Sequence, residues 1–209
     1  YCEGQTEESF INKVLAPYLA NMNIWVRPIV CTTKITPTQR YKGGVSDYKK
    51  IKKELQLICR QHHNEIVTTM FDYYAMPVNT PLIDCADPDI YSCIEKIESA
   101  IKQDIGLPNC CFNLSLHEFE GLLFSNPASF GLIADADIVQ RVQEIKDSAR
   151  TPEHINNSPE TAPSKRLQAL IPGYAKVKNG SILSQDMGID VIMENCKHFS
   201  DWINKIIAL

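Results

Sequence analysis

The chain has 209 residues, of which 44% are hydrophobic and 22% charged, so it is long enough and apolar enough to form a buried core. We expect one substantial domain, or one domain with a small appendage. The net charge of −4 disfavours a protein that coats duplex nucleic acid, because such proteins carry a basic surplus. A nuclease stays compatible with this charge, since bound divalent metal offsets a site rich in acids.

The sequence contains neither a membrane-spanning pattern nor a secretory signal. No apolar run approaches the ~20 residues that cross a bilayer. The eight cysteines include no CxxC pair, and several stand inside apolar runs, as buried thiols do. We therefore expect a protein of the reducing cytoplasm, without membrane contact, without a disulfide framework and without zinc.

Strands and helices are expected to alternate through the first part of the chain. The first two residues have the pattern of a strand end, and Thr6 is expected to cap the helix that follows. A strand over residues 24–31 comes next, near a sheet edge because it contains a proline. Ser46 is then expected to cap a second helix, which ends near Gln61.

The alternation continues with two more strands. Residues 65–71 form a β-branched run that predicts a strand. Asp87 and Pro88 are expected to open a third helix, because Asp caps helices well and Pro fits the first helical position. Residues 110–116 predict the other strand. Because strands that alternate with helices indicate βαβ crossovers, we expect an α/β fold with a mostly parallel sheet flanked by helices.

After the last predicted strand the chain becomes helical and loop-like. Helices are expected over residues 137–147, 164–170 and 199–207. We expect this part to pack on the sheet as a C-terminal extension that is not an independent domain. The predicted organisation is a core over residues 1–124 and a helical extension over residues 125–209.

Acidic residues follow three of the predicted strands. They are Glu3 and Glu7, Asp72, and the pair Glu118 and Glu120. Ligands bind beyond the carboxyl ends of the strands in an open parallel sheet, so we expect these acids to converge. Crowded carboxylates repel one another, and a shared hard cation such as Mg²⁺ removes the conflict. Acids at ordinary solvated helix starts explain the same spacing, so both interpretations stay open.

Residues 3–7, Glu-Gly-Gln-Thr-Glu, resemble the opening of Toprim domains, the metal-binding module of topoisomerases, primases and the overcoming-lysogenization-defect nucleases. Nearly the whole chain also resembles a widespread, uncharacterised bacterial family of Toprim-like proteins, through residues 67–74, 116–124 and 158–166. In the nuclease branch, acids at the positions of the five residues above bind two metals. The resemblance implies a Toprim-like fold and an Mg²⁺- or Mn²⁺-dependent endonuclease with Glu3 as a catalytic residue.

One position departs from the Toprim pattern. Many Toprim domains carry Asp-x-Asp, whereas here Tyr74 stands where the second Asp is expected after Asp72. A neutral phenol does not replace a carboxylate as a Mg²⁺ ligand, so one metal and two metals both stay open. This departure favours an alternative function, a non-catalytic module that keeps the Toprim scaffold and holds a partner. Primase-like nucleotidyl transfer is a third hypothesis. It is the weaker one, because we find no pattern of a nucleotide-binding or template-binding companion domain in this sequence.

Further basic residues and a histidine complete the predicted site. By resemblance, Lys165 would steady the reacting phosphate, with Arg166 beside it, although a solvated helix face explains the pair as well. His117 is a candidate proton donor, but such a histidine more often stabilises a strand end. Arg40 and Lys42 stand beside a glycine pair and are expected to contact nucleic acid.

The partners expected for this chain are nucleic acid and a separate ATPase. The sequence contains no GxxxxGK[ST] loop, so it is not expected to bind ATP in that way. Toprim nucleases of this kind are often joined to an ATPase domain, and this resemblance implies an ATPase encoded nearby, in phage defence. DNA and RNA both stay open as substrates.

Overall fold

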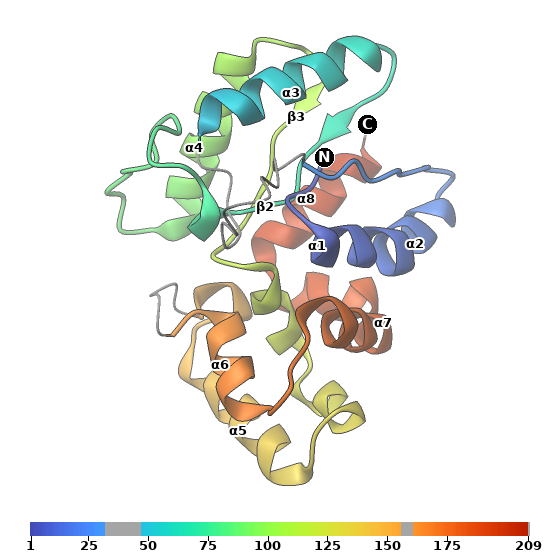
Figure 1. Cartoon of the computed structure of the whole chain (residues 1–209), viewed down its shortest axis with the longest axis vertical. Helices are drawn as coiled ribbons and strands as arrows, with labels where there is room; N and C mark the ends of the chain where they lie inside the picture. Colours follow the sequence, from blue (N-terminus) through green and yellow to red (C-terminus); the bar gives the residue numbers. More distant parts are fainter. Residues whose placement is uncertain (32–46, 156–160, 209) are drawn as a thin grey trace, which may run out of the picture. The chain divides into compact units, whose positions relative to one another are not determined.

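In the computed structural model (Figure 1), the described part of the chain forms two compact units, each built from separate stretches of sequence. The described residues are 1–31, 47–155 and 161–208. The first unit consists of Tyr1–Glu3 and Ile29–Leu114, and the second of Gly4–Pro28 and Ser115–Leu209. The sequence predicted a boundary after residue 124, which does not coincide with the boundaries of these two units; the predicted domain division stays a prediction.

The first unit contains α3 (Tyr48–Gln61) and α4 (Ile90–Ile105). Asp47 caps α3 by accepting a hydrogen bond from the Lys49 N–H, and Asp89 caps α4 by accepting one from the Ser92 N–H. The predicted cap Ser46 lies outside the described residues, and the cap of α3 is the residue after it. The prediction that Asp87 opens α4 is wrong, because Asp87 instead accepts a hydrogen bond from the Asp89 N–H.

The strands of the first unit are short. β1 (Val67–Thr68) pairs in parallel with β3 (Cys110–Cys111). β2 (Phe71–Asp72) pairs with β4 (Leu114–Ser115), the strand in which the chain passes from the first unit to the second. Cys2 adds parallel bridges to Val30 and Met70. The chain is therefore mixed α/β, and its short parallel strands lie within the predicted strands over residues 65–71 and 110–116. The prediction of a strand over residues 24–31 is wrong, because only an isolated bridge at Val30 forms there.

A side chain separates the β1–β3 pair from the β2–β4 pair. Thr69 Oγ1 donates a hydrogen bond to the Asn113 carbonyl oxygen at 2.7 Å and accepts one from the Asn113 N–H at 2.8 Å. Both residues are buried. The predicted strands over residues 65–71 and 110–116 are each split in two here, because a hydroxyl takes the place of the backbone ladder.

The second unit is mostly helical. Its N-terminal stretch contains α1 (Gln5–Phe10), a π-helical turn (Ile11–Leu15) and α2 (Ala16–Ala20). Gly4 is the N-cap of α1, so the prediction that Thr6 caps this helix is wrong. The Gly4 N–H donates a hydrogen bond to Glu7 Oε2 at 2.9 Å, as in a capping box.

The C-terminal stretch of the second unit is helical, as predicted. It contains the 3₁₀ segments Phe119–Ser125, Pro127–Leu132 and Pro152–His154 and the helices α5 (Ala136–Ser148), α6 (Pro163–Leu170), α7 (Lys176–Asn195) and α8 (Lys197–Ile207). α5, α6 and α8 confirm the three helices predicted from periodicity, with small shifts at their ends. Among the described residues, no helix combines the length and the apolar character needed to cross a membrane.

The helix α7 was not predicted, because glycine and serine residues interrupt its apolar pattern. Gly188, with φ +75°, kinks the helix. Gly180 lies against the Phe119 ring, and a Cβ at this position would be 3.2 Å from a ring carbon. The glycine that weakens the helical pattern therefore permits close packing of α7 on the 3₁₀ segment that begins at Phe119.

Aromatic packing joins α1 to the same 3₁₀ segment. The centroid of the Phe10 ring is 5.2 Å from that of Phe119 and 6.1 Å from that of Phe199. All three rings are buried. Because Glu7 lies on α1 and two acids flank Phe119 in the chain, this packing determines where the acids of the second unit lie.

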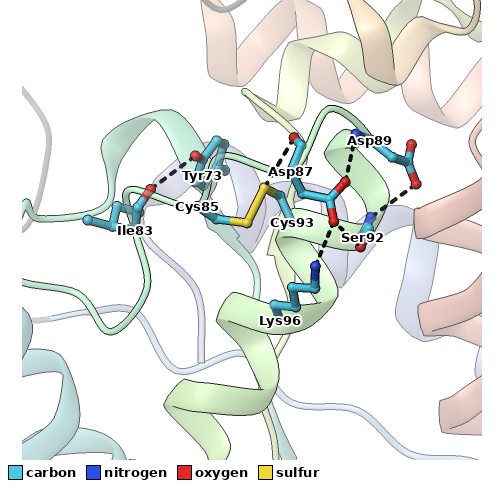
Figure 2. The surroundings of a disulfide bond; sticks show 8 residues. All are labelled: Tyr73, Ile83, Cys85, Asp87, Asp89, Ser92, Cys93 and Lys96. Atoms are coloured by element: carbon cyan, nitrogen blue, oxygen red, sulfur yellow. Dashed lines mark hydrogen bonds and ion pairs between the residues drawn. A yellow bond between two sulfur atoms is a disulfide. The ribbon is translucent and has the colours of Figure 1, made fainter.

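A disulfide joins Cys85, in the segment before α4, to Cys93 in the first turn of that helix (Figure 2). The Cα atoms are 5.7 Å apart, the usual spacing of disulfide-bonded residues. The expectation of a chain without disulfides is therefore wrong. A turn in which the Cys85 N–H donates to the Leu82 carbonyl oxygen brings the two cysteines together, and no CxxC motif marks it. The cytoplasmic location stays a prediction.

Candidate carboxylate site

The structure places the predicted acids in both units. In the first unit, Glu3 Oε2 accepts a hydrogen bond from the Asp72 N–H at 3.3 Å, and both side chains are half-buried. In the second unit, Glu7, Glu118 and Glu120 are all buried. The predicted sharing of one cation site by all five acids stays a prediction.

The local fold fixes each acid of the second unit differently. Glu7 stands in the first turn of α1 and is held by the Gly4 N–H. Glu118 precedes the 3₁₀ segment, and its Oε2 accepts a hydrogen bond from the Ser164 N–H of α6 at 2.9 Å. Glu120 lies inside the 3₁₀ segment and is only 2% exposed. Two elements, α1 and the 3₁₀ segment with its cap residue, thus bring three carboxylates into buried positions of the second unit.

Lys176, the first residue of α7, supplies a positive charge to these acids. Its Nζ lies 3.4 Å from Glu120 Oε1, 3.5 Å from Glu120 Oε2 and 4.0 Å from Glu118 Oε1. It also lowers the pKa of Glu7, against the larger effect of burial. We call Glu7, Glu118, Glu120 and Lys176 the carboxylate site. Sequence reasoning missed Lys176 because it begins a helix that the pattern does not reveal.

Burial and charge oppose full ionisation of the carboxylate site. Burial raises the pKa of Glu120 to about 7; Lys176 opposes this shift, and the neighbouring charge of Glu118 adds to it. Burial also raises the pKa of Glu7. Three carboxylates face one ammonium, so the site has an excess of negative charge whenever all three are ionised.

Two more buried polar groups adjoin the carboxylate site. Tyr174 is 8% exposed, and after burial the charges of Glu120 and Glu118 are the next causes that raise the pKa of its phenol. His117 is also 8% exposed and precedes Glu118 in the chain. Among the described residues, Tyr174 Oη, His117 Nδ1 and Glu120 Oε1 have no hydrogen-bond partner. Buried polar atoms are rarely left unpaired in native proteins, so this cluster indicates a place for a polar ligand or water.

His117 has an unusual backbone as well. Its φ is +62°, a left-handed conformation that a residue other than glycine rarely adopts and that is often found at functional sites. Burial and, to a smaller extent, His154 lower the pKa of His117 to about 4, against an opposing effect of Glu118. The imidazole is therefore neutral near pH 7. The role predicted for it, proton donation to a leaving group, stays a prediction.

A family model described as a domain of unknown function, DUF4276, matches residues 2–207. The chain belongs to this family. In the comparisons with curated proteins and with solved structures, nothing matches the chain. The DUF4276 match spans both units, and all the acids discussed above lie within it.

The other predicted site residues of this DUF4276 protein are Lys165, Arg166, Arg40 and Lys42. Lys165 is exposed in the first turn of α6. Arg166 donates a hydrogen bond through Nε to the Thr161 carbonyl oxygen at 2.7 Å, so its guanidinium is engaged with the backbone. Arg40 and Lys42 lie outside the described residues. Their predicted roles toward nucleic acid stay predictions.

The carboxylate site has ligands of the type that a hard cation needs, but its present arrangement is an ion-pair cluster. Within residues 1–31, 47–155 and 161–208, no group of three or more His, Cys, Asp or Glu is arranged to hold a metal ion. Lys176 stands between the carboxylates instead. Carboxylate oxygens are nevertheless the donors that Mg²⁺ and Mn²⁺ prefer, and Glu120 Oε1 accepts no hydrogen bond from the described residues.

Proposed function

We propose that this DUF4276 protein is a nuclease with a Toprim-like fold, and that it binds Mg²⁺ or Mn²⁺ through Glu7, Glu118 and Glu120. One observation carries the proposal: three buried carboxylates share a single ammonium, and one of their oxygens lacks a hydrogen bond among the described residues. A divalent cation removes such an excess of negative charge. The resemblance of residues 3–7 to the Toprim opening supports the same chemistry.

The residues of this chain have separable roles in the proposed reaction. When bound, the cation would activate water and stabilise charge on the phosphate. Lys176, which is partly exposed, is expected to turn from the carboxylates toward a phosphate oxygen of the substrate. The Tyr174 hydroxyl would donate a hydrogen bond to the same anion. Glu3 and Asp72 form a second acidic pair, in the first unit, for which the Toprim resemblance implies metal binding as well.

Cleavage assays with the full chain test this proposal. Labelled single-stranded DNA, duplex DNA and RNA are incubated with the protein and Mg²⁺ or Mn²⁺, with chelator as a control. We expect Glu118→Gln and Glu120→Gln to lower the cleavage rate at least about 100-fold, because each removes a ligand charge. The matched control is Glu144→Gln, an exposed acid on α5, which we expect to retain the wild-type rate within about twofold. Equal activity of all variants would refute the site.

Cation binding is measured separately, because the Toprim resemblance implies an ATPase partner that cleavage could require. Calorimetric titration with Mn²⁺ is expected to show binding to the wild-type chain and at least about tenfold weaker binding to Glu120→Gln. Lys176→Met is expected to bind Mn²⁺ more tightly than the wild type, since it removes the competing ammonium. No Mn²⁺ binding by any of the three proteins would exclude the metal site.

The ion pair itself favours a second candidate, a non-catalytic module that holds a partner on a Toprim-like scaffold. Lys176 already neutralises part of the charge of Glu118 and Glu120 without a metal. On this alternative, Lys176→Met only destabilises the second unit and produces no gain in Mn²⁺ affinity. The sign of the Lys176→Met effect on Mn²⁺ binding therefore separates the two functions.

A further inference from the structure

The Cys85–Cys93 disulfide joins the segment before α4 to the first turn of that helix (Figure 2), and α4 itself is held by a buried apolar face that includes Ile94 and Ile97. The Cys85 side chain is half-exposed, whereas Cys93 is only 2% exposed. Solvent-borne reagents therefore reach one sulfur of the pair more easily than the other. This asymmetry distinguishes the pair from Cys59 and Cys110, which are both buried free thiols.

We propose that Cys85 and Cys93 form a thiol–disulfide exchange site for dithiol reductants, and that the redox state of the pair controls the order of residues 80–86. We call residues 80–86 the clamp segment. This role goes beyond the proposed nuclease function and does not depend on it.

The exchange reaction follows from the different surroundings of the two sulfurs. A thiolate of the dithiol attacks Cys85 Sγ, forms a mixed disulfide and breaks the Cys85–Cys93 bond, whose electron pair leaves with Cys93. Because Cys85 is the more exposed of the two cysteines, attack occurs at its sulfur, and Cys93, in the first turn of α4, is the leaving group. Cys93 then takes a proton. The second thiol of the reductant then attacks the reductant sulfur that is bonded to Cys85. This closes the cyclic disulfide of the reductant and releases Cys85 as a thiol.

The reduced Cys93 thiol has a hydrogen-bond acceptor in place. Its Sγ lies 3.6 Å from the carbonyl oxygen of Asp87, within reach of an S–H donor. Both redox states of Cys93 therefore fit the same surroundings. Reduction moves two electrons from the dithiol, which leaves as its cyclic disulfide, to the two protein thiols, and a small disulfide such as oxidised glutathione accepts them when the bond forms again.

Asp87 keeps the cysteines near each other when the bond is open. Its Oδ1 accepts a hydrogen bond from the Asp89 N–H at 2.9 Å. Its Oδ2 accepts hydrogen bonds from Ser92 Oγ at 2.8 Å and from Lys96 Nζ at 2.6 Å. These contacts tie residue 87 to the first turns of α4 without using either sulfur, so the reduced pair remains ready to form the bond again.

At its other end the clamp segment is bounded by Asn79. Asn79 Nδ2 donates a hydrogen bond to Asp47 Oδ1 at 2.9 Å, and the Tyr48 N–H donates one to Asn79 Oδ1 at 3.1 Å. Figure 2 shows two interactions that tie the stretch between Asn79 and Asp87 to residues outside it. They are the disulfide and a 3.4 Å hydrogen bond from Tyr73 Oη to the Ile83 carbonyl oxygen.

The clamp segment contains a residue whose backbone depends on being held. Leu82 has φ +55° and a side chain that is 60% exposed, so a left-handed conformation is imposed on a leucine that contributes little to the core. Such a conformation persists only where the surrounding structure fixes it. When the disulfide opens, the tie nearest to Leu82 on its C-terminal side is lost, and we expect the segment to become mobile.

Hydrogen exchange of the full chain in two buffers, one with an excess of a dithiol and one with oxidised glutathione, tests the proposal. Reduction is expected to raise the exchange of the backbone amides of residue 80 and residues 82–86 at least about tenfold, Pro81 having no N–H. The amides of α3 and of the later turns of α4 are expected to change by less than about twofold. The Cys85→Ser variant is expected to show the fast exchange in both buffers. Equal exchange of residues 80–86 in the two buffers, or a disulfide that a dithiol opens only on unfolding, would overturn the proposal.

Alkylation and mass spectrometry test the assigned chemistry. With oxidised glutathione, Cys85 in the Cys93→Ser variant is expected to form the mixed disulfide faster than Cys93 in the Cys85→Ser variant. Asp87→Ala is expected to slow re-formation of the Cys85–Cys93 bond at least about fivefold, because the thiols separate. Asp84→Ala, an exposed acid of the clamp segment, is the matched control and is expected to re-form it at the wild-type rate. Equal rates for the two Asp variants would refute the role of Asp87.

Discussion

Replacing Glu120 with glutamine is expected to stabilise the protein at neutral and alkaline pH and to change its stability little in acid. Burial is the largest cause that raises the pKa of Glu120, from 4.5 to about 7. The folded state therefore holds the proton more tightly than the unfolded state. Stability that is fully present below pH 4.5 is lost as the pH rises through about 7.

The size of the effect follows from the rise in pKa. At 1.36 kcal/mol for each pKa unit, it corresponds to about 3 kcal/mol of unfolding free energy. Glutamine has nearly the same shape as protonated glutamate and has no proton to lose. The Glu120→Gln variant is thus expected to match the wild type at about pH 4 and to exceed it by about 3 kcal/mol at about pH 8.

Urea unfolding, followed by tryptophan fluorescence and circular dichroism between about pH 4 and pH 8, measures this difference. Trp202 is buried in α8 and reports on the second unit. Glu144→Gln serves as the control, since an exposed acid is expected to give a small difference at every pH. A Glu120→Gln variant that is less stable than the wild type at about pH 8 would show that Lys176 more than compensates for burial, and the reasoning would fail.

Three other predictions concern individual contacts. Thr69→Val is expected to lower the unfolding free energy by about 2 kcal/mol, because it leaves the buried N–H and carbonyl of Asn113 without the Thr69 hydroxyl. A loss below about 0.5 kcal/mol in urea unfolding would contradict this prediction. Glu153→Ala is expected to lower the unfolding free energy by about 2 kcal/mol, because this buried carboxylate accepts hydrogen bonds from two N–H groups at the start of α8. Thermal unfolding followed by circular dichroism measures the loss, and an unchanged melting temperature would count against the prediction. In the proposed metal site, the affinity for Mn²⁺ is expected to fall about tenfold for each pH unit below about 7, because a proton on Glu120 competes with the metal. A pH-independent affinity in calorimetric titration would exclude this competition.

The alternating pattern of the sequence predicted where strands and helices lie better than it predicted where they end. The β-branched run over residues 65–71 does contain strand, yet the sequence gives no sign that Thr69 interrupts it. That interruption depends on Asn113, which is 44 residues away. Helix caps failed for a local reason: Asp87 and Thr6 are good cap residues, but Asp89 caps α4 through the Ser92 N–H, and Gly4, whose N–H is bound by Glu7, is the N-cap of α1.

The acids of the carboxylate site could be named from the sequence, whereas the cation among them could not. Glu7, Glu118 and Glu120 each follow a predicted strand or open a predicted helix, so their positions carry a local signal. Lys176 lies at the start of α7, whose apolar pattern Gly180 weakens for the sake of packing against Phe119. The Toprim resemblance directed attention to Lys165 on α6, which is exposed.

The charge count of the carboxylate site explains why it can be tested without knowing the substrate. Three buried carboxylates and one ammonium leave excess negative charge, and only a proton, a second ammonium or a bound cation can offset it. A purely structural ion pair has no need of the third acid, because Lys176 with Glu118 and Glu120 alone already carries that excess. Glu7 makes the imbalance larger, and burial raises its pKa as well. Glu7 and Glu118 each accept a backbone hydrogen bond, from Gly4 and Ser164, so Glu120 is the acid on which the proposed cation would have the largest effect.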